Sequence, residues 1–124
     1  MSLTLPNFIE DLQDPELAPM LSPTRYMSLL EMDAETLARN ARVSVSAITK
    51  TPGAAAIQNH LRDNLRVIKA AYDTYGGDLA QSLRWFRAES LSAFGQRTAE
   101  QAVSVGRADD VIRLIDSPHA GAAG

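Results

Sequence analysis

A stripe of apolar residues spaced three or four apart constrains this chain more than any other feature of its sequence. It consists of Ile57, Leu61, Leu65, Ile68, Tyr72 and Tyr75. Because an α-helix repeats every 3.6 residues, this spacing places all six side chains on one helical face. Gly76 and Gly77 follow directly, and glycine readily takes the left-handed conformation that ends helices. The sequence therefore predicts that the longest helix lies between Gly53 and Tyr75.

Helix-capping residues divide the rest of the chain into shorter helices. Ser22 followed by Pro23 is typical of a helix start. Further N-cap candidates are Asp33, Ser44, Asp78 and Thr98, of which Thr98 can form a capping box with Gln101. A last helix is expected from Ala108 to Ile115, burying Val111, Ile112, Leu114 and Ile115. No stretch alternates apolar and polar residues over strand length, so the predicted fold class is all-α.

The domain organisation follows from length and composition. A chain of 124 residues is long enough to form the hydrophobic core of one domain. Residues 1–21 contain three prolines and several acids, which predicts an N-terminal arm with one helical turn around Phe8 to Leu12. Residues 22–77 hold the short helices and the long helix, and 78–118 form a C-terminal helical region. The small, glycine-rich residues 119–124 are expected to be a flexible tail.

The residue inventory argues against an enzyme. The chain has no cysteine, which excludes disulfides, thiolate metal sites and cysteine nucleophiles. His60 and His119 are the only imidazoles and do not lie in a metal-ligand spacing, and His60 is expected to be exposed or half-buried on its helix. We therefore expect no catalysis, cofactor or metal. Without a leader-like or membrane-spanning apolar run, the expected location is the cytoplasm.

The charges are unevenly distributed along the chain. The net charge is −3. Residues 1–35 carry seven acids and one base, whereas residues 36–77 carry six bases and two acids, and the remainder is nearly neutral. A phosphate-binding surface needs local rather than global positive charge, so the middle segment is able to touch DNA. A solvated helix face accounts for the same charges.

Residues 35–51 have the pattern of two short helices joined by a tight turn. Leu37, Ala38, Val43 and Ile48 fall at positions that pack inward, and Val45 projects from the second helix with its polar neighbours. The segment resembles the helix-turn-helix of Xre-type regulators, which gives as DNA-binding candidates Arg39, Arg42, Ser44, Ser46, Thr49 and Lys50. Short helices joined by tight turns are also common packing units, so a purely structural role stays open.

Arg42 departs from the usual helix-turn-helix pattern. It occupies the turn position that glycine usually fills. A non-glycine residue in the left-handed conformation costs about 1 kcal/mol. The sequence therefore favours a remodelled turn at this point.

The C-terminal region, from Leu79 to Pro118, combines aromatic, glycine and aliphatic residues in a fixed order. They are Trp85, Leu91, Phe94, Gly95, Arg97, Thr98, Gly106, Val111, Leu114 and Ile115. By these residues the region resembles the toxin-binding domain shared by the Xre, MbcA and ParS antitoxins. Two prolines of the family pattern are absent, with Glu89, Ser90 and Ala99 in that region instead. Individually, Trp85 and Phe94 also fit ordinary core positions.

The resemblance implies an antitoxin whose partner is a RES-domain toxin, a class that destroys NAD. Such an antitoxin covers the toxin's active site, represses its own operon by binding operator DNA, and itself binds neither NAD nor a metal. The toxin-binding candidates are Trp85, Phe94, Arg97, Asp109, Asp110, Arg113, Asp116 and Ser117. The acids among them complement the cationic rim expected of a nucleotide pocket, although acids at a helix start are also explained by the helix dipole.

Three functions therefore remain for test. The first is the antitoxin, expected to be a homodimer because two half-sites of an operator need two recognition helices. The second is a helix-turn-helix transcriptional regulator without a toxin, dimerising through its C-terminal helices. The third is a helical adaptor in which the motif serves packing only.

Overall fold

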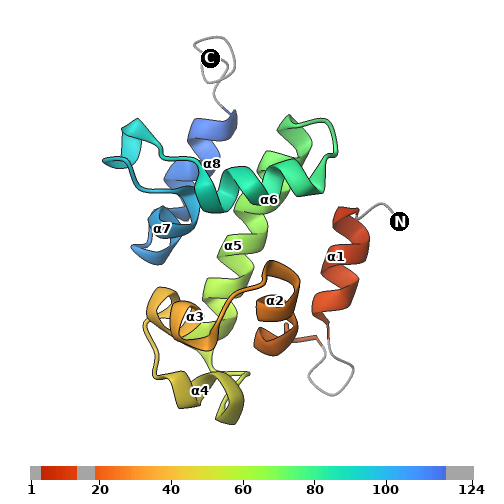
Figure 1. The fold of residues 1–124 in the computed structure, drawn as a ribbon, viewed down its shortest axis with the longest axis vertical. Helices are drawn as coiled ribbons and strands as arrows, with labels where there is room; N and C mark the ends of the chain where they lie inside the picture. The colour runs from red at the N-terminus through yellow and green to blue at the C-terminus, as the bar shows by residue number, and fades with distance from the viewer. Residues whose placement is uncertain (1–3, 14–18, 117–124) are drawn as a thin grey trace. The chain divides into compact units, whose positions relative to one another are not determined.

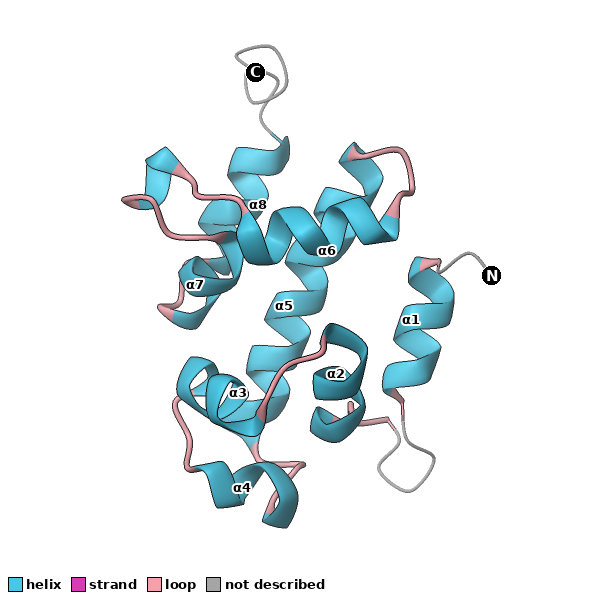
Figure 2. Cartoon of the chain, in the orientation of Figure 1, coloured by secondary structure: helices cyan, strands magenta, loops and turns pink. Residues whose placement is uncertain are grey.

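The computed structural model describes residues 4–13 and 19–116, and the chain is all-α over these ranges. Figure 1 shows the succession of helices, and Figure 2 shows that the described segments between them are loops and turns rather than strands. The elements are α1 (Leu5–Leu12), α2 (Pro23–Leu30), α3 (Ala34–Ala41), α4 (Val45–Lys50), α5 (Ala55–Thr74), α6 (Leu79–Ala88), the 3-10 turn η1 (Ser92–Phe94), α7 (Ala99–Ser104) and α8 (Ala108–Asp116). The predicted fold class is confirmed, and α5 lies where the longest helix was expected.

The chain divides into two compact units, which we describe separately. Pro6–Arg62 form the N-terminal unit, and Asp63–Gly124 together with Met1–Leu5 form the C-terminal unit. The first turns of α5 belong to the N-terminal unit and the remainder belongs to the C-terminal unit.

Helix α1 is longer than the single turn that the sequence predicts. It runs from Leu5 to Leu12, with Phe8 and Leu12 buried one turn apart. Pro6 lies in its first turn, where the missing N–H of proline costs nothing because that group has no partner within the helix. The prolines of this segment therefore lie at the start of α1 and beyond its end.

Two of the three caps predicted in the N-terminal unit form side-chain hydrogen bonds, whereas Ser44 lies at the N-cap position of α4 without a side-chain capping bond. The Ser22 hydroxyl accepts a hydrogen bond from the Arg25 N–H at 3.2 Å. The Asp33 carboxylate accepts one from the Thr36 N–H at 2.8 Å. Each bond satisfies an N–H group that has no partner within the helix, so α2 and α3 begin where their caps dictate.

The interior of the N-terminal unit is mainly apolar, and its buried polar side chains are those of Ser22, Gln58 and His60. Its fully buried side chains include Phe8, Leu12, Tyr26, Leu37, Ile48, Ile57 and Leu61. The Gln58 amide accepts from the Leu21 N–H at 2.9 Å and donates to the carbonyls of Leu21 and Pro52, both at 2.8 Å. Gln58 thereby joins the residue before α2 and the turn after α4 to the start of α5. His60 is also buried, so the expectation of an exposed or half-buried histidine was wrong.

The C-terminal unit is likewise held by its predicted caps. The Asp78 carboxylate accepts from the Gln81 N–H at 3.0 Å at the start of α6. Thr98 and Gln101 form the reciprocal capping box at the start of α7, with bonds of 2.9 and 3.1 Å. Between α6 and α7, the Leu91 N–H donates to the Arg97 carbonyl at 2.9 Å and closes the loop around η1.

Helix α8 is less buried than its apolar content suggests. The expected burial holds for Val111, which has no exposed surface, but Ile112, Leu114 and Ile115 are each only half-buried. The sequence-based expectation of four buried residues was therefore too high. A nine-residue helix packed along one side buries a single line of side chains, and the neighbours of that line stay at its margin.

Candidate functional site

The turn between α3 and α4 has the left-handed geometry of a helix-turn-helix. Arg42 has φ 61° and ψ 45°. The Arg42 N–H donates to the Arg39 carbonyl at 3.2 Å, and the Val43 N–H donates to the Ala38 carbonyl at 3.0 Å. These bonds satisfy carbonyls at the end of α3 and offset the cost of a non-glycine residue at this position. The expectation of a remodelled turn was therefore wrong.

Helix α4 packs against α3 with one face and leaves the other exposed (Figure 1). Ile48 is buried beneath it, as the motif requires. The exposed side chains of α4 are Val45, Ser46, Thr49 and Lys50. The Thr49 hydroxyl donates to the Ser46 carbonyl at 3.3 Å, and the hydroxyls of Ser44 and Ser46 lie 3.3 Å apart. The exposed face is therefore made of short side chains with one lysine.

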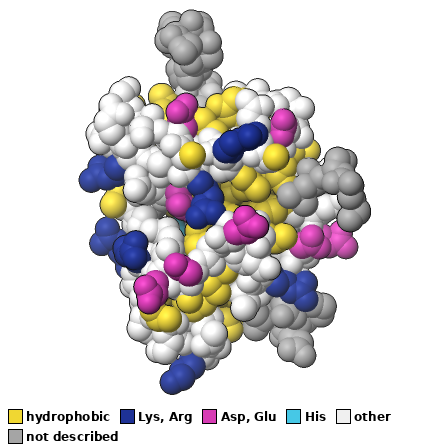
Figure 3. All heavy atoms as spheres, viewed as in Figure 1, with side chains coloured by type: hydrophobic (Ala, Val, Ile, Leu, Met, Phe, Trp, Pro, Cys, Tyr) yellow, Lys and Arg dark blue, Asp and Glu magenta, His cyan; other side chains and the backbone are white. Residues whose placement is uncertain are grey.

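All six DNA-binding candidates are exposed within the N-terminal unit. They are Arg39, Arg42, Ser44, Ser46, Thr49 and Lys50. Figure 3, which shows one face of the molecule, has Lys and Arg side chains over the part occupied by α3 and at the tip occupied by α4, with acidic side chains between them. The hydrogen bond from Thr36, helped by the nearby Arg39 cation, lowers the pKa of Asp33. Positive and negative charges thus share the surface of α3, and α4 contributes only the cation of Lys50.

Substitutions at the two left-handed turns distinguish an effect on stability from an effect on DNA binding. Glu31, with φ 53°, and Arg42 both end their helices in the left-handed conformation. We expect Glu31→Gly and Arg42→Gly each to raise the free energy of unfolding by about 0.5 to 1 kcal/mol, since glycine adopts this conformation without strain. Urea denaturation measures this change. Only Arg42→Gly is expected to weaken DNA binding as well, and equal DNA affinities of the two variants would contradict this assignment.

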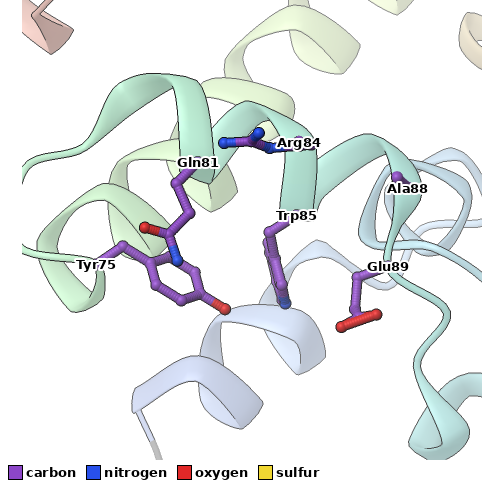
Figure 4. A pocket seen from close by; sticks show the side chains of 6 residues that line it. All are labelled: Tyr75, Gln81, Arg84, Trp85, Ala88 and Glu89. Atoms are coloured by element: carbon purple, nitrogen blue, oxygen red, sulfur yellow. The ribbon is translucent and has the colours of Figure 1, made fainter.

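The C-terminal unit has a shallow groove of about 280 Å³ beside Trp85. It is lined by Tyr75, Gln81, Arg84, Trp85, Ala88 and Glu89, which come from the residue after α5, from α6 and from the residue after α6 (Figure 4). The rings of Tyr75 and Trp85 are tilted at 55° with centroids 6.3 Å apart. Burial and the nearby charge of Glu89 raise the pKa of Tyr75. The groove thus combines an aromatic pair with one cation and one carboxylate at its sides.

The other toxin-binding candidates have different surroundings. Phe94 is buried, with the Arg107 guanidinium 4.9 Å from its ring centre. Arg97 and Asp116 are exposed, and Ser117 lies outside the described residues. Phe94 therefore acts in the packing of this unit, whereas Trp85, Arg97 and Asp116 have surface available for contact.

The acids of α8 form ion pairs within the chain. Asp109 lies 2.6 Å from the Arg66 guanidinium of α5. Asp110 lies 2.6 Å from both Arg107 and Arg113, and their hydrogen bonds and charges, Arg107 first, lower the pKa of its carboxyl. The negative charge that the sequence attributes to this helix is thus largely neutralised by neighbouring arginines, and Asp116 keeps its exposed carboxylate at the end of the helix.

Two side-chain pairs of the C-terminal unit were not predicted from the sequence. Tyr75 was assigned to the helical stripe, but its ring also forms the groove with Trp85. Glu100 is buried beside Arg87 at 3.5 Å, and burial raises the pKa of its carboxyl while Arg87 lowers it. Neither pair has a signal in sequence spacing, because the partners lie ten or more residues apart and in different elements of the structure.

Over residues 4–13 and 19–116, no group of three or more His, Cys, Asp or Glu side chains is placed to hold a metal ion. Among the described helices, none combines the length and the apolar content needed to cross a membrane.

Comparison of the chain with protein-family models, curated proteins and solved structures found no significant match.

Proposed function

We propose that the protein is the antitoxin of a toxin-antitoxin pair: it binds operator DNA through α3 and α4 and neutralises a RES-domain, NAD-degrading toxin through its C-terminal unit. The observation that carries the DNA-binding part is the α3-turn-α4 geometry with all six predicted contact residues exposed. A recognition helix inserts its first residues into the major groove while the preceding helix crosses the backbone. In this arrangement α4 reads bases, and the cations of Arg39, Arg42 and Lys50 contact phosphates.

The toxin-binding part is supported by the resemblance of Leu79–Pro118 to the antitoxin domain and by the groove beside Trp85. Tryptophan is enriched among the few residues that dominate a protein interface, and Trp85 is half-exposed. The exposed charges of Arg84 and Glu89 line the same groove. Inhibition then follows from coverage of the toxin's active site, without chemistry by the antitoxin.

Coexpression of this chain with a RES-domain toxin encoded beside it tests the proposal. We expect the two proteins to copurify, the toxin's NAD loss to be suppressed, and the complex to retain duplexes from a random-sequence pool. Selective DNA binding without any effect on the toxin would identify a regulator without a toxin. Absence of both activities would leave a helical adaptor and overturn the proposal.

A further inference from the structure

Val45 is an apolar side chain exposed in the middle of a polar surface. It is 48% exposed at the first position of α4, and Val105 at 41% is the other large hydrophobic residue with comparable exposure in the described part of the chain. The helix places Thr49 one turn after Val45 and Ser46 beside both. Burial in the core does not explain Val45, since the inward-facing position of α4 is filled by Ile48.

The chemistry of the α4 face matches one kind of base edge. Guanine is read by long side chains that donate two hydrogen bonds, and α4 has only Lys50 of that kind, at its last residue. Thymine presents a methyl group in the major groove, which is contacted by small apolar side chains. The hydroxyl proton of Thr49 is already donated to the Ser46 carbonyl, so its oxygen is left to accept a hydrogen bond, as the N6 amino group of adenine requires.

We infer that Val45 is a specificity-determining residue that reads the 5-methyl group of a thymine in the major groove, so that the operator has an A·T pair opposite the start of α4. This inference rests on the proposed DNA binding and names the base pair that it recognises. The cations of Arg39 and Arg42 support it, because charge attraction to phosphates holds the short side chains of α4 against the base edges.

Replacement of thymine by deoxyuridine isolates this contact, because only the methyl group is removed. Duplexes enriched from a random-sequence pool are resynthesised with deoxyuridine at one thymine at a time, and their affinities are measured by fluorescence anisotropy. We expect one thymine in each half-site at which the wild type loses about fourfold in affinity, as for one methyl-sized apolar contact. Val45→Ala is expected to lose the same factor on thymine DNA and to show no further loss on deoxyuridine DNA.

Val105→Ala is the matched control, since it removes the same atoms from the other exposed valine. It should retain the full preference for thymine. If every thymine is replaceable in the wild type although selected DNA is bound, the inference is wrong while the proposed function stands. A change in dimer dissociation by Val45→Ala in analytical ultracentrifugation, without thymine preference, would assign Val45 to a second copy of the chain. If the pool yields no bound DNA at all, the proposed DNA binding fails and this inference fails with it.

Discussion

Arg42→Ala combined with Lys50→Ala is expected to lower DNA affinity by about tenfold to hundredfold at 0.1 M salt, for specific and nonspecific duplexes alike. Each phosphate contact releases condensed counterions, with a contribution of about 0.9 to the slope of log affinity against log salt. Loss of two contacts therefore flattens that slope by about 2. Fluorescence anisotropy titrations at several salt concentrations measure both the affinity and the slope.

Arg62→Ala combined with Lys69→Ala is the matched control. It removes the same charge from exposed positions of α5, where Arg62 hydrogen-bonds Asn59 and Lys69 pairs with Asp73 at 3.0 Å. If net charge alone governed binding, both double variants would lose affinity equally. Unchanged affinity of the Arg42 and Lys50 double variant would remove α3 and α4 from the DNA interface.

Trp85→Ala is expected to weaken toxin binding by about thirtyfold or more, which is the threshold of about 2 kcal/mol used for a dominant interface residue. The substitution empties the groove of its larger ring while the proposed DNA-binding surface of the N-terminal unit is untouched. Toxin affinity is measured by isothermal titration calorimetry, and operator affinity in the same preparation shows whether the N-terminal unit is folded.

Two further substitutions separate contact from packing in the C-terminal unit. Trp85→Phe keeps an aromatic ring in the groove and should restore most of the toxin affinity. Phe94→Leu changes a buried side chain, so it should lower the melting temperature with little change in toxin affinity below that temperature. Equal toxin binding by Trp85→Ala and the wild type would place the inhibitory surface elsewhere, with Arg97 and the residues from Asp116 onward as the next candidates.

Local chemistry made much of the fold predictable. Asp33, Asp78 and Thr98 were identified as caps because a side-chain oxygen bonds an N–H group only three residues away, and sequence spacing alone specifies that geometry. The apolar stripe that ends at Tyr75 was likewise predictable, because its spacing of three or four residues indicates one face of a helix. In the candidate DNA interface, Ala38 and Ile48 were predicted to face the core. The residues beside them on the same helices were therefore predicted to be exposed.

Features that depend on contacts between distant residues were not predictable in this way. The pairing of Asp109 with Arg66 joins residues on α8 and α5, and it neutralises a charge that the sequence presents as free. Ile112 is half-buried because the elements packed against α8 cover only part of its surface, and the sequence does not show how large that part is. At Arg42, the sequence shows a non-glycine residue at a turn position, but the compensating Val43 N–H bond to Ala38 belongs to the folded turn.

The buried amide of Gln58 has a consequence for how DNA preference can evolve. Its three hydrogen bonds to the backbone of Leu21 and Pro52 require a group that both donates and accepts, so glutamate or leucine at this position leaves buried partners unsatisfied. The side chains of Val45 and Thr49 have no buried backbone groups to satisfy, because they are exposed to solvent. Mutational drift is therefore restricted at position 58 and permitted on the outer face of α4. If α4 binds DNA as proposed, descendants of this protein can acquire new operators while inheriting the same scaffold.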